Sequence, residues 1–265
     1  MKEEIKTVDD LLNIVTRKIK GSIHHYTSYE SLVSILKHKT FRLTRLDLLN
    51  DKAEERLANC HDNELRYNLS FSNTSNESVA MWAIYGGRSS MKLRLSLSRK
   101  KLIESFNNNF YFDHEKLNII PYGSFDMSKN AGQFVKKQFS LYDVVYLNKK
   151  NNQLRYSSKT LKGIVVDERV IERFKGFIKY SAWEFESEAR ISVLINRNMN
   201  FVQKINEPQY IYGGISDDLL KSFKITFNPW IAKEMKDEIK DSLNRLADCD
   251  LKYEDSSLEG QVDLM

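Results

Sequence analysis

The chain has 265 residues, 41% of them hydrophobic, and 41 Lys and Arg against 36 Asp and Glu give a formal net charge of +5. This content can supply a sizeable core, and only 10 Gly and 3 Pro argue against repeats or low-complexity linkers. No segment approaches the roughly 20 apolar residues of a membrane span, and the two cysteines match no metal or disulfide framework. We therefore expect a cytoplasmic protein with no membrane partner, whose charge is compatible with a polyanion.

The first hundred residues predict helices alternating with short strands. Residues 7–20 have apolar side chains at helical spacing, which indicates an amphipathic N-terminal helix. A strand over 23–26 precedes a second helix, which we expect to begin with a capping box of Thr27 and Glu30. Alternating apolar and polar residues predict further strands, which cover residues 41–44, 65–71 and 91–97, with a short helix over 77–85 before the last of them.

The remainder predicts more strands and a C-terminal helix. The strands are expected over residues 142–147 and 163–166 and, as a hairpin-like pair, over 210–212 and 223–227. Asn228 and Pro229 are expected to start the last helix. The fold class that this order predicts is α+β, with mainly antiparallel sheets flanked by helices. We expect residues 1–250 to form a single domain and residues 251–265 to form a polar, flexible tail.

The segment 179–195, KYSAWEFESEARISVLI, concentrates charged and aromatic residues in front of an alternating run. On a helix, one face would hold Lys179, Trp183, Glu186 and Arg190. On a strand, Glu186, Glu188 and Arg190 would share a face instead. The alternation favours a strand that begins near Glu186 or Glu188, with a short helix or loop before it. We therefore expect these charged side chains to point away from the apolar core, toward a cleft or toward solvent.

Two other groups of residues are candidates for ligand contacts. His25 ends a predicted strand just before a capped helix, where side chains commonly line a cleft, although a structural role is the alternative. His24 and His25 point to opposite faces of that strand, so they cannot both serve one site. Trp82 and Tyr85 lie at helical spacing and suit a core as well as a ligand platform.

The sequence lacks most familiar catalytic motifs. Its five histidines show no paired helical spacing near a carboxylate, so we expect no dedicated metal site. No glycine-rich phosphate loop, GxSxG or Cys/His pair is present. The scattered residues Asp51, Glu54, Glu186, Glu188 and Lys179 leave open a magnesium-dependent nuclease or phosphodiesterase.

Four short motifs occur in one order along the chain. They are a Tyr-Thr-Ser before a helix, an Asn-Asp with a following Glu, a Met-Trp with a Tyr three residues on, and a WxxExExR segment. Together they resemble the DUF2971 family, a large bacterial family of unassigned function. The matching residues are Tyr26, Thr27, Ser28, Asn50, Asp51, Glu54, Met81, Trp82, Tyr85, Trp183, Glu186, Glu188 and Arg190.

A more distant similarity is to ADP-ribosyltransferases of the His-Tyr-Glu type, which have an HxT strand, a helix and a late acidic ExE at a strand start. It implies an ADP-ribosyltransferase-like core in which His25 and Thr27 hold the adenosine-side ribose of NAD. Tyr85 would form an aromatic wall for nicotinamide, and Glu188 would be the catalytic acid. Arg190 or Lys179 would contact the pyrophosphate or, alternatively, keep Glu186 ionised. The chain departs from the pattern in the bulky Tyr26 of HxT and in a Tyr85 that lies on a predicted helix.

The similarity implies an NAD-dependent ADP-ribosyltransferase that modifies a nucleic acid or a protein, as bacterial toxins and phage-defence effectors do. An antitoxin or regulatory protein is then a further expected partner. An ionised glutamate that holds a ribose hydroxyl stabilises the positive charge that develops as the nicotinamide bond breaks. Two alternatives stay open: the metal-dependent nuclease, and a non-catalytic module for a ligand or partner in which WxxExExR is a structural clamp.

Overall fold

The computed structural model describes residues 21–49, 64–85, 91–106, 110–114, 118–121, 139–148, 153–156, 159–165, 176–196 and 208–262. The helix expected over 7–20 lies outside these ranges. The chain falls into two compact units. The first unit lies within residues 42–70 and 107–213, and the second unit lies within 20–41, 71–106 and 214–265. The single domain expected over residues 1–250 stays a prediction.

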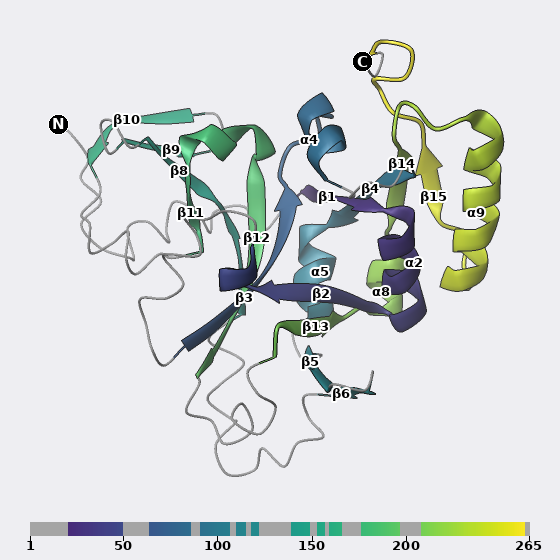
Figure 1. Cartoon of the computed structure of the whole chain (residues 1–265), viewed down its shortest axis with the longest axis horizontal. Helices are drawn as coiled ribbons and strands as arrows, with labels where there is room; N and C mark the ends of the chain where they lie inside the picture. The colour runs from purple at the N-terminus through teal and green to yellow at the C-terminus, as the bar shows by residue number, and fades with distance from the viewer. Residues whose placement is uncertain are drawn as a thin grey trace. The chain divides into compact units, whose positions relative to one another are not determined.

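The second unit combines a mainly antiparallel sheet with helices (Figure 1). Its strand order is β15-β14-β4-β1, continued by the end of β3, and only β14 and β15 are parallel. The strands are β1 (Ser22–Ser28), β4 (Lys92–Ser98), β14 (Lys224–Phe227) and β15 (Lys252–Glu254). The helices are α2 (Tyr29–His38), α4 (Val79–Ile84), α5 (Arg99–Phe106), α8 (Asp217–Leu220) and α9 (Lys233–Ala247).

One face of this sheet forms the apolar core of the second unit. Ile23, Leu95 and Ile225, from three neighbouring strands, are completely buried. Helices α2 and α9 lie side by side (Figure 1), and the Tyr29 hydroxyl is 2.7 Å from Ser242 Oγ. Because successive side chains of a strand alternate between faces, the residues between these apolar ones point to the opposite face.

The first unit is built mostly from strands. One sheet has the order β10-β9-β8-β11, and a second contains β3-β2-β13-β5-β6, with β12 joining β3 to β7. The strands of the first sheet are β8 (Val145–Asn148), β9 (Gln153–Tyr156), β10 (Lys159–Val165) and β11 (Ile178–Tyr180). Those of the second are β2 (Thr40–Arg45), β3 (Glu64–Ser72), β5 (Phe110–His114), β6 (Asn118–Pro121), β7 (Phe139–Asp143), β12 (Glu188–Asn196) and β13 (Tyr210–Gly214). Two 3-10 turns, η1 (Leu46–Leu48) and η3 (Ser181–Glu186), complete it.

The predicted fold class is confirmed at the level of a mixed α and β chain with a mainly antiparallel sheet flanked by helices. An ADP-ribosyltransferase-like core stays a prediction. None of the helices in the described ranges has the length and apolar character needed to span a bilayer.

Three local expectations differ from the structure. Ser28, not Thr27, caps α2, because β1 pairs with β4 as far as Ser28 and Thr27 is still a buried strand residue. The strands β13 and β14 do not form a hairpin: β13 pairs with β5, and β14 pairs with β4 and β15. Helix α9 begins only at Lys233, because the Asn228 side chain accepts a hydrogen bond from Trp230 N in a turn before it.

The end of the chain also differs from the expected polar tail. Residues 252–254 form β15, which pairs with β14, and Lys236 of α9 is within 2.7 Å of Asp255 and 2.8 Å of Glu259. The Trp230 indole donates to the carbonyl of Val262 at 2.9 Å. Charge pairing and strand addition therefore hold residues 252–262, which we name the C-terminal segment, even though it has few apolar residues.

The cap of α2 gives a test of where the helix begins. Ser28 Oγ accepts a hydrogen bond from Ser31 N at 3.2 Å, so Ser28→Ala should lower the free energy of unfolding by about 1 kcal/mol. Ser34→Ala, on an exposed position of the same helix, should be neutral or slightly stabilising because alanine is the better helix former. Urea denaturation of both variants measures the difference, and equal stabilities would contradict the cap.

Candidate functional site

The acidic segment folds into a closed network of charges in the first unit. Glu188 and Arg190 share a face of β12, and Arg190 binds Glu188 side-on, with Nε 2.7 Å from Oε1 and Nη2 2.9 Å from Oε2. The third guanidinium nitrogen, Nη1, donates to the carbonyl of Gly176 at 2.6 Å. Lys179 Nζ lies 2.6 Å from Glu186 Oε2 and 3.0 Å from Glu188 Oε2. Two cations and two carboxylates thus neutralise one another.

This network is buried, so the expectation that its members point to a cleft or to solvent is wrong. Glu186, Glu188 and Arg190 are 3%, 4% and 1% exposed. Burial alone would raise the pKa of Glu188, but the charges of Arg190 and Lys179 outweigh it and hold that pKa well below its usual range. The mutual pairing is what allows these charges inside the unit. Both carboxylate oxygens of Glu188 are engaged by cations, which argues against their holding a ribose hydroxyl.

The chain reaches this arrangement through one unusual backbone residue. Trp183 and Glu186 lie in the 3-10 turn η3, which ends at Ser187 with a φ of 44°, and β12 begins at the next residue. Left-handed backbone is unfavourable for residues other than glycine.

The turn also places Trp183 beside the charged network, because Lys179 Nζ lies 5.2 Å from the centre of the Trp183 ring. The predicted strand start and the turn before it are confirmed.

Of the residues expected to hold NAD in the second unit, His25 and Tyr85 contact aromatic or apolar side chains and Thr27 is buried. The His25 ring lies on the core side of β1, 6.1 Å from the centroid of Phe41 and 5.5 Å from that of Phe71. Thr27 is 5% exposed. Tyr85 is the C-cap of α4 and packs against a cluster of Tyr26, Met81 and Trp82. Their proposed roles stay predictions, but these contacts favour packing over ligand binding.

The opposite face of the same sheet is polar. Across the strands, Ser72 of β3 pairs with His24 of β1, His24 pairs with Ser96 of β4, and Ser96 pairs with Lys224 of β14. In the next row Tyr26 pairs with Arg94, Arg94 with Thr226, and Thr226 with Glu254 of β15. We name His24, Ser72, Arg94, Ser96, Thr226 and Glu254 the polar strip.

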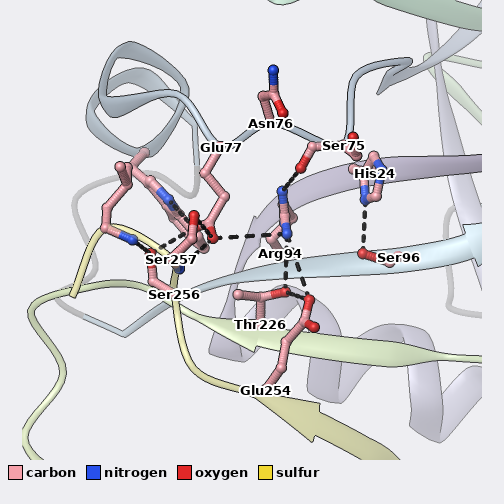
Figure 2. Close-up of polar contacts among 12 residues, drawn as sticks. His24, Ser75, Asn76, Glu77, Arg94, Ser96, Thr226, Glu254, Ser256 and Ser257 are labelled. Carbon is pink, nitrogen blue, oxygen red and sulfur yellow. Dashed lines mark hydrogen bonds and ion pairs between the residues drawn. The ribbon is translucent and has the colours of Figure 1, made fainter.

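Arg94 is the central cation of the polar strip. It lies between Glu77 and Glu254 (Figure 2) and is 5% exposed. Its Nη1 donates to the carbonyl of Ser75 at 3.1 Å, but the contacts of Nη2 are long: 3.4 Å to Thr226 Oγ1, 3.5 Å to Glu254 Oε1 and 3.9 Å to Glu77 Oε1. Its Nε is buried without a hydrogen-bond partner. A buried donor left unpaired costs about 1–3 kcal/mol.

Arg94 and Arg190 differ in whether a carboxylate binds the edge of the guanidinium that carries Nε and Nη2. The Nε and Nη2 groups point in parallel and match the two oxygens of a carboxylate or phosphate. Glu188 fills this edge of Arg190, with both distances under 3 Å. No carboxylate fills it in Arg94, where Nε has no partner and Nη2 has only distant ones. The first unit therefore holds a closed arginine and the second unit an open one.

Besides its two glutamate neighbours, Arg94 has uncharged polar groups on the same face of the sheet. His24 Nδ1 is 2.7 Å from Ser96 Oγ (Figure 2), and burial, helped by the charge of Arg94, lowers the pKa of His24 to about 4. The imidazole is therefore neutral near pH 7. Ser72 is paired with His24 across the strands, and its buried hydroxyl has no hydrogen-bond partner. The strip thus offers an unfilled guanidinium edge, an unpaired hydroxyl and a neutral imidazole.

No group of three or more potential metal ligands among His, Cys, Asp and Glu occurs in the part of the chain that the structure describes. Of the scattered acids that leave a nuclease open, Asp51 and Glu54 lie outside the described residues, and Glu186 and Glu188 belong to the closed network. That alternative gains no support from the described residues.

Comparisons of the chain with protein-family models, with curated proteins and with solved structures find no match. The resemblance to DUF2971 and to ADP-ribosyltransferases therefore rests on the sequence motifs and stays a prediction.

The polar strip was not among the sites predicted from the sequence, but it has a signal there. Residues 91–98, MKLRLSLS, alternate strictly, which places Arg94 and Ser96 on one face of a strand whose other face is apolar. An arginine in the middle of such a strand is the signal. The partners of Arg94 come from residues 26, 75–77, 226 and 254, and no local pattern connects these.

The pKa of His24 predicts a pH dependence of stability. Because the folded pKa of about 4 lies below the unfolded value of 6.5, the unfolded state binds the proton preferentially between them. The contribution of His24 to the free energy of unfolding is present above pH 6.5, and it should fall by about 2 kcal/mol between pH 7 and pH 5. His24→Gln should flatten this part of the curve of unfolding free energy against pH. His38→Gln removes an exposed imidazole and is the control; an unchanged slope in the His24 variant would contradict the prediction.

The closed network predicts a large effect of Glu188 on stability. Glu188→Gln leaves Arg190 and Lys179 buried with one carboxylate fewer, and it should lower the free energy of unfolding by about 3–5 kcal/mol. Glu238→Gln, at an exposed position on α9, should change it by less than about 0.5 kcal/mol. Chemical denaturation compares the two. If the Glu188 and Glu238 variants have equal stability, the WxxExExR segment is not a structural clamp.

Proposed function

We propose that the second unit binds a small anionic molecule on the open edge of Arg94, and that WxxExExR is a structural clamp. The single observation that supports this is the contrast between two buried arginines. Arg190 has its side-on edge filled by Glu188, whereas the same edge of Arg94 has a buried Nε without a partner. A phosphate or carboxylate would supply the two acceptors that this edge needs.

The surroundings of Arg94 suit such a ligand in two ways. First, Arg94 is almost completely buried, so its attraction for an anion is weakened less by water than that of a surface arginine. Second, Ser72 and the neutral His24 can exchange hydrogen bonds with hydroxyl groups beside the anion without adding charge. A molecule with a phosphate next to a sugar has this combination of groups.

NAD is the ligand to test first, because it combines a pyrophosphate with two riboses and because the resemblance to ADP-ribosyltransferases implies it. Under this proposal the pyrophosphate lies on Arg94. The reaction proposed is transfer of ADP-ribose to a nucleic acid or protein acceptor, as in a bacterial toxin or phage-defence effector, with a group other than Glu188 on the ribose. If NAD binds and no nicotinamide is released in the presence of RNA, DNA or protein, the chain is a binding module instead.

A lysine at position 94 separates the effect of the planar guanidinium from the effect of its positive charge. Arg94→Lys keeps the positive charge but loses the planar edge, so it should weaken binding of NAD, ADP-ribose and pyrophosphate at least tenfold. Arg42→Lys, which alters an exposed arginine that lies over the Tyr210 ring in the first unit, should leave binding unchanged. Isothermal calorimetry on the three proteins measures this.

Thermal unfolding of the Arg94 variant shows whether it is folded, and Ser72→Ala gives a second, milder test at the same site. Loss of binding in Arg94→Lys with a folded protein supports the proposal. Binding of all three probes that is equal in the wild-type protein and in Arg94→Lys would overturn it, as would a wild-type protein that binds none of them.

A further inference from the structure

Two glutamates near Arg94 fix the position of the C-terminal segment: Glu77, which binds its serines, and Glu254, which is part of it. Glu77, which precedes α4, accepts hydrogen bonds from Ser256 Oγ at 2.6 Å and from the amide and hydroxyl of Ser257 at 2.7 and 2.9 Å. Figure 2 shows these serines with Glu77 to the left of Arg94 and Glu254 below it. Leu258 packs against the cluster of Tyr26, Met81 and Trp82. The segment is thus held to the same face that presents Arg94.

Glu254 is the carboxylate nearest to the open edge of Arg94. Its Oε1 lies 3.5 Å from Arg94 Nη2 and accepts a hydrogen bond from Thr226 Oγ1 at 2.7 Å. Its Oε2 forms an ion pair with Lys224, and 29% of its side chain is exposed. Burial would raise the pKa of Glu254, but Lys224, Thr226 and Arg94 lower it, so the group is charged near pH 7. It stands close to the edge without filling it.

We infer that Glu254 is an internal competitor for the anionic ligand, which makes the C-terminal segment an autoinhibitory strap. This inference rests on the proposed function of Arg94. An incoming phosphate and the Glu254 carboxylate are both negatively charged and approach the same nitrogen of Arg94. Each therefore weakens the binding of the other to that nitrogen. Lys224 already pairs with the other oxygen of Glu254 and can keep this ion pair when the ligand binds to Arg94.

The chain offers a matched pair of glutamates for the test. Glu254→Gln removes the competing charge and keeps the shape, so it should tighten binding of inorganic pyrophosphate about fivefold to tenfold. Glu259→Gln removes a carboxylate of the same segment that lies on Lys236 rather than on Arg94, and it should leave the affinity unchanged. Calorimetry gives the affinities, and thermal unfolding shows whether each variant is folded.

A second measurement follows the strap in the wild-type protein. Pyrophosphate should speed amide hydrogen exchange at residues 254–259, because displacement of Glu254 loosens the attachment to Glu77. If pyrophosphate binds through Arg94 but Glu254→Gln has the wild-type affinity and exchange is unchanged, the strap is refuted and the anion site stands. If neither the wild-type protein nor Glu254→Gln binds pyrophosphate, both the strap and the anion site are refuted.

Discussion

The need to neutralise a buried guanidinium constrains both units of this chain. An arginine cannot lose its proton at any ordinary pH, so one placed inside a protein must be surrounded by acceptors. Arg190 meets this demand completely, with a side-on carboxylate and a backbone carbonyl. Arg94 meets it only in part. The surroundings of the two residues differ accordingly: the donors of Arg190 are filled by Glu188 and Gly176, whereas Nε of Arg94 has no partner.

This difference suits the closed network and the polar strip to different tasks. A bidentate ion pair in a buried network is difficult to rearrange, because any movement exposes an unpaired charge to an apolar environment. Such a network suits a clamp. The loose contacts of Arg94 cost little to exchange, since each of them is at or beyond the ordinary hydrogen-bond length apart from the one to Ser75. Loose contacts suit a site that is filled and emptied.

Local patterns in the sequence were sufficient for β1 to β4 and β12 to β14, but not for β5, β6, β9, β11 and β15. The alternation in residues 91–98 fixes the face of Arg94, and that in 188–195 predicts β12 with a start near Glu186 or Glu188. Burial depended on distant residues. Glu188 is paired with Lys179 from β11, and the carbonyl of Gly176 accepts a hydrogen bond from Arg190. His25 faces Phe41 and Phe71, which β2 and β3 supply. The position of the α2 cap depended on where strand pairing stops, since Thr27 and Ser28 are both able to cap a helix.

The left-handed backbone at Ser187 shows why the acidic segment has two incompatible periodicities. Residues 181–186 repeat as a helical turn, which brings Trp183 and Glu186 to the side of Lys179, and residues from 188 onward repeat as a strand, which brings Glu188 over Arg190. A single residue at φ 44° changes the chain from one repeat to the other. Each assignment is therefore realised in part: the turn holds Trp183 and Glu186, and the strand holds Glu188 and Arg190. The change of backbone conformation at Ser187 turns the chain so that Glu186 and Glu188, on either side of it, both contact Lys179.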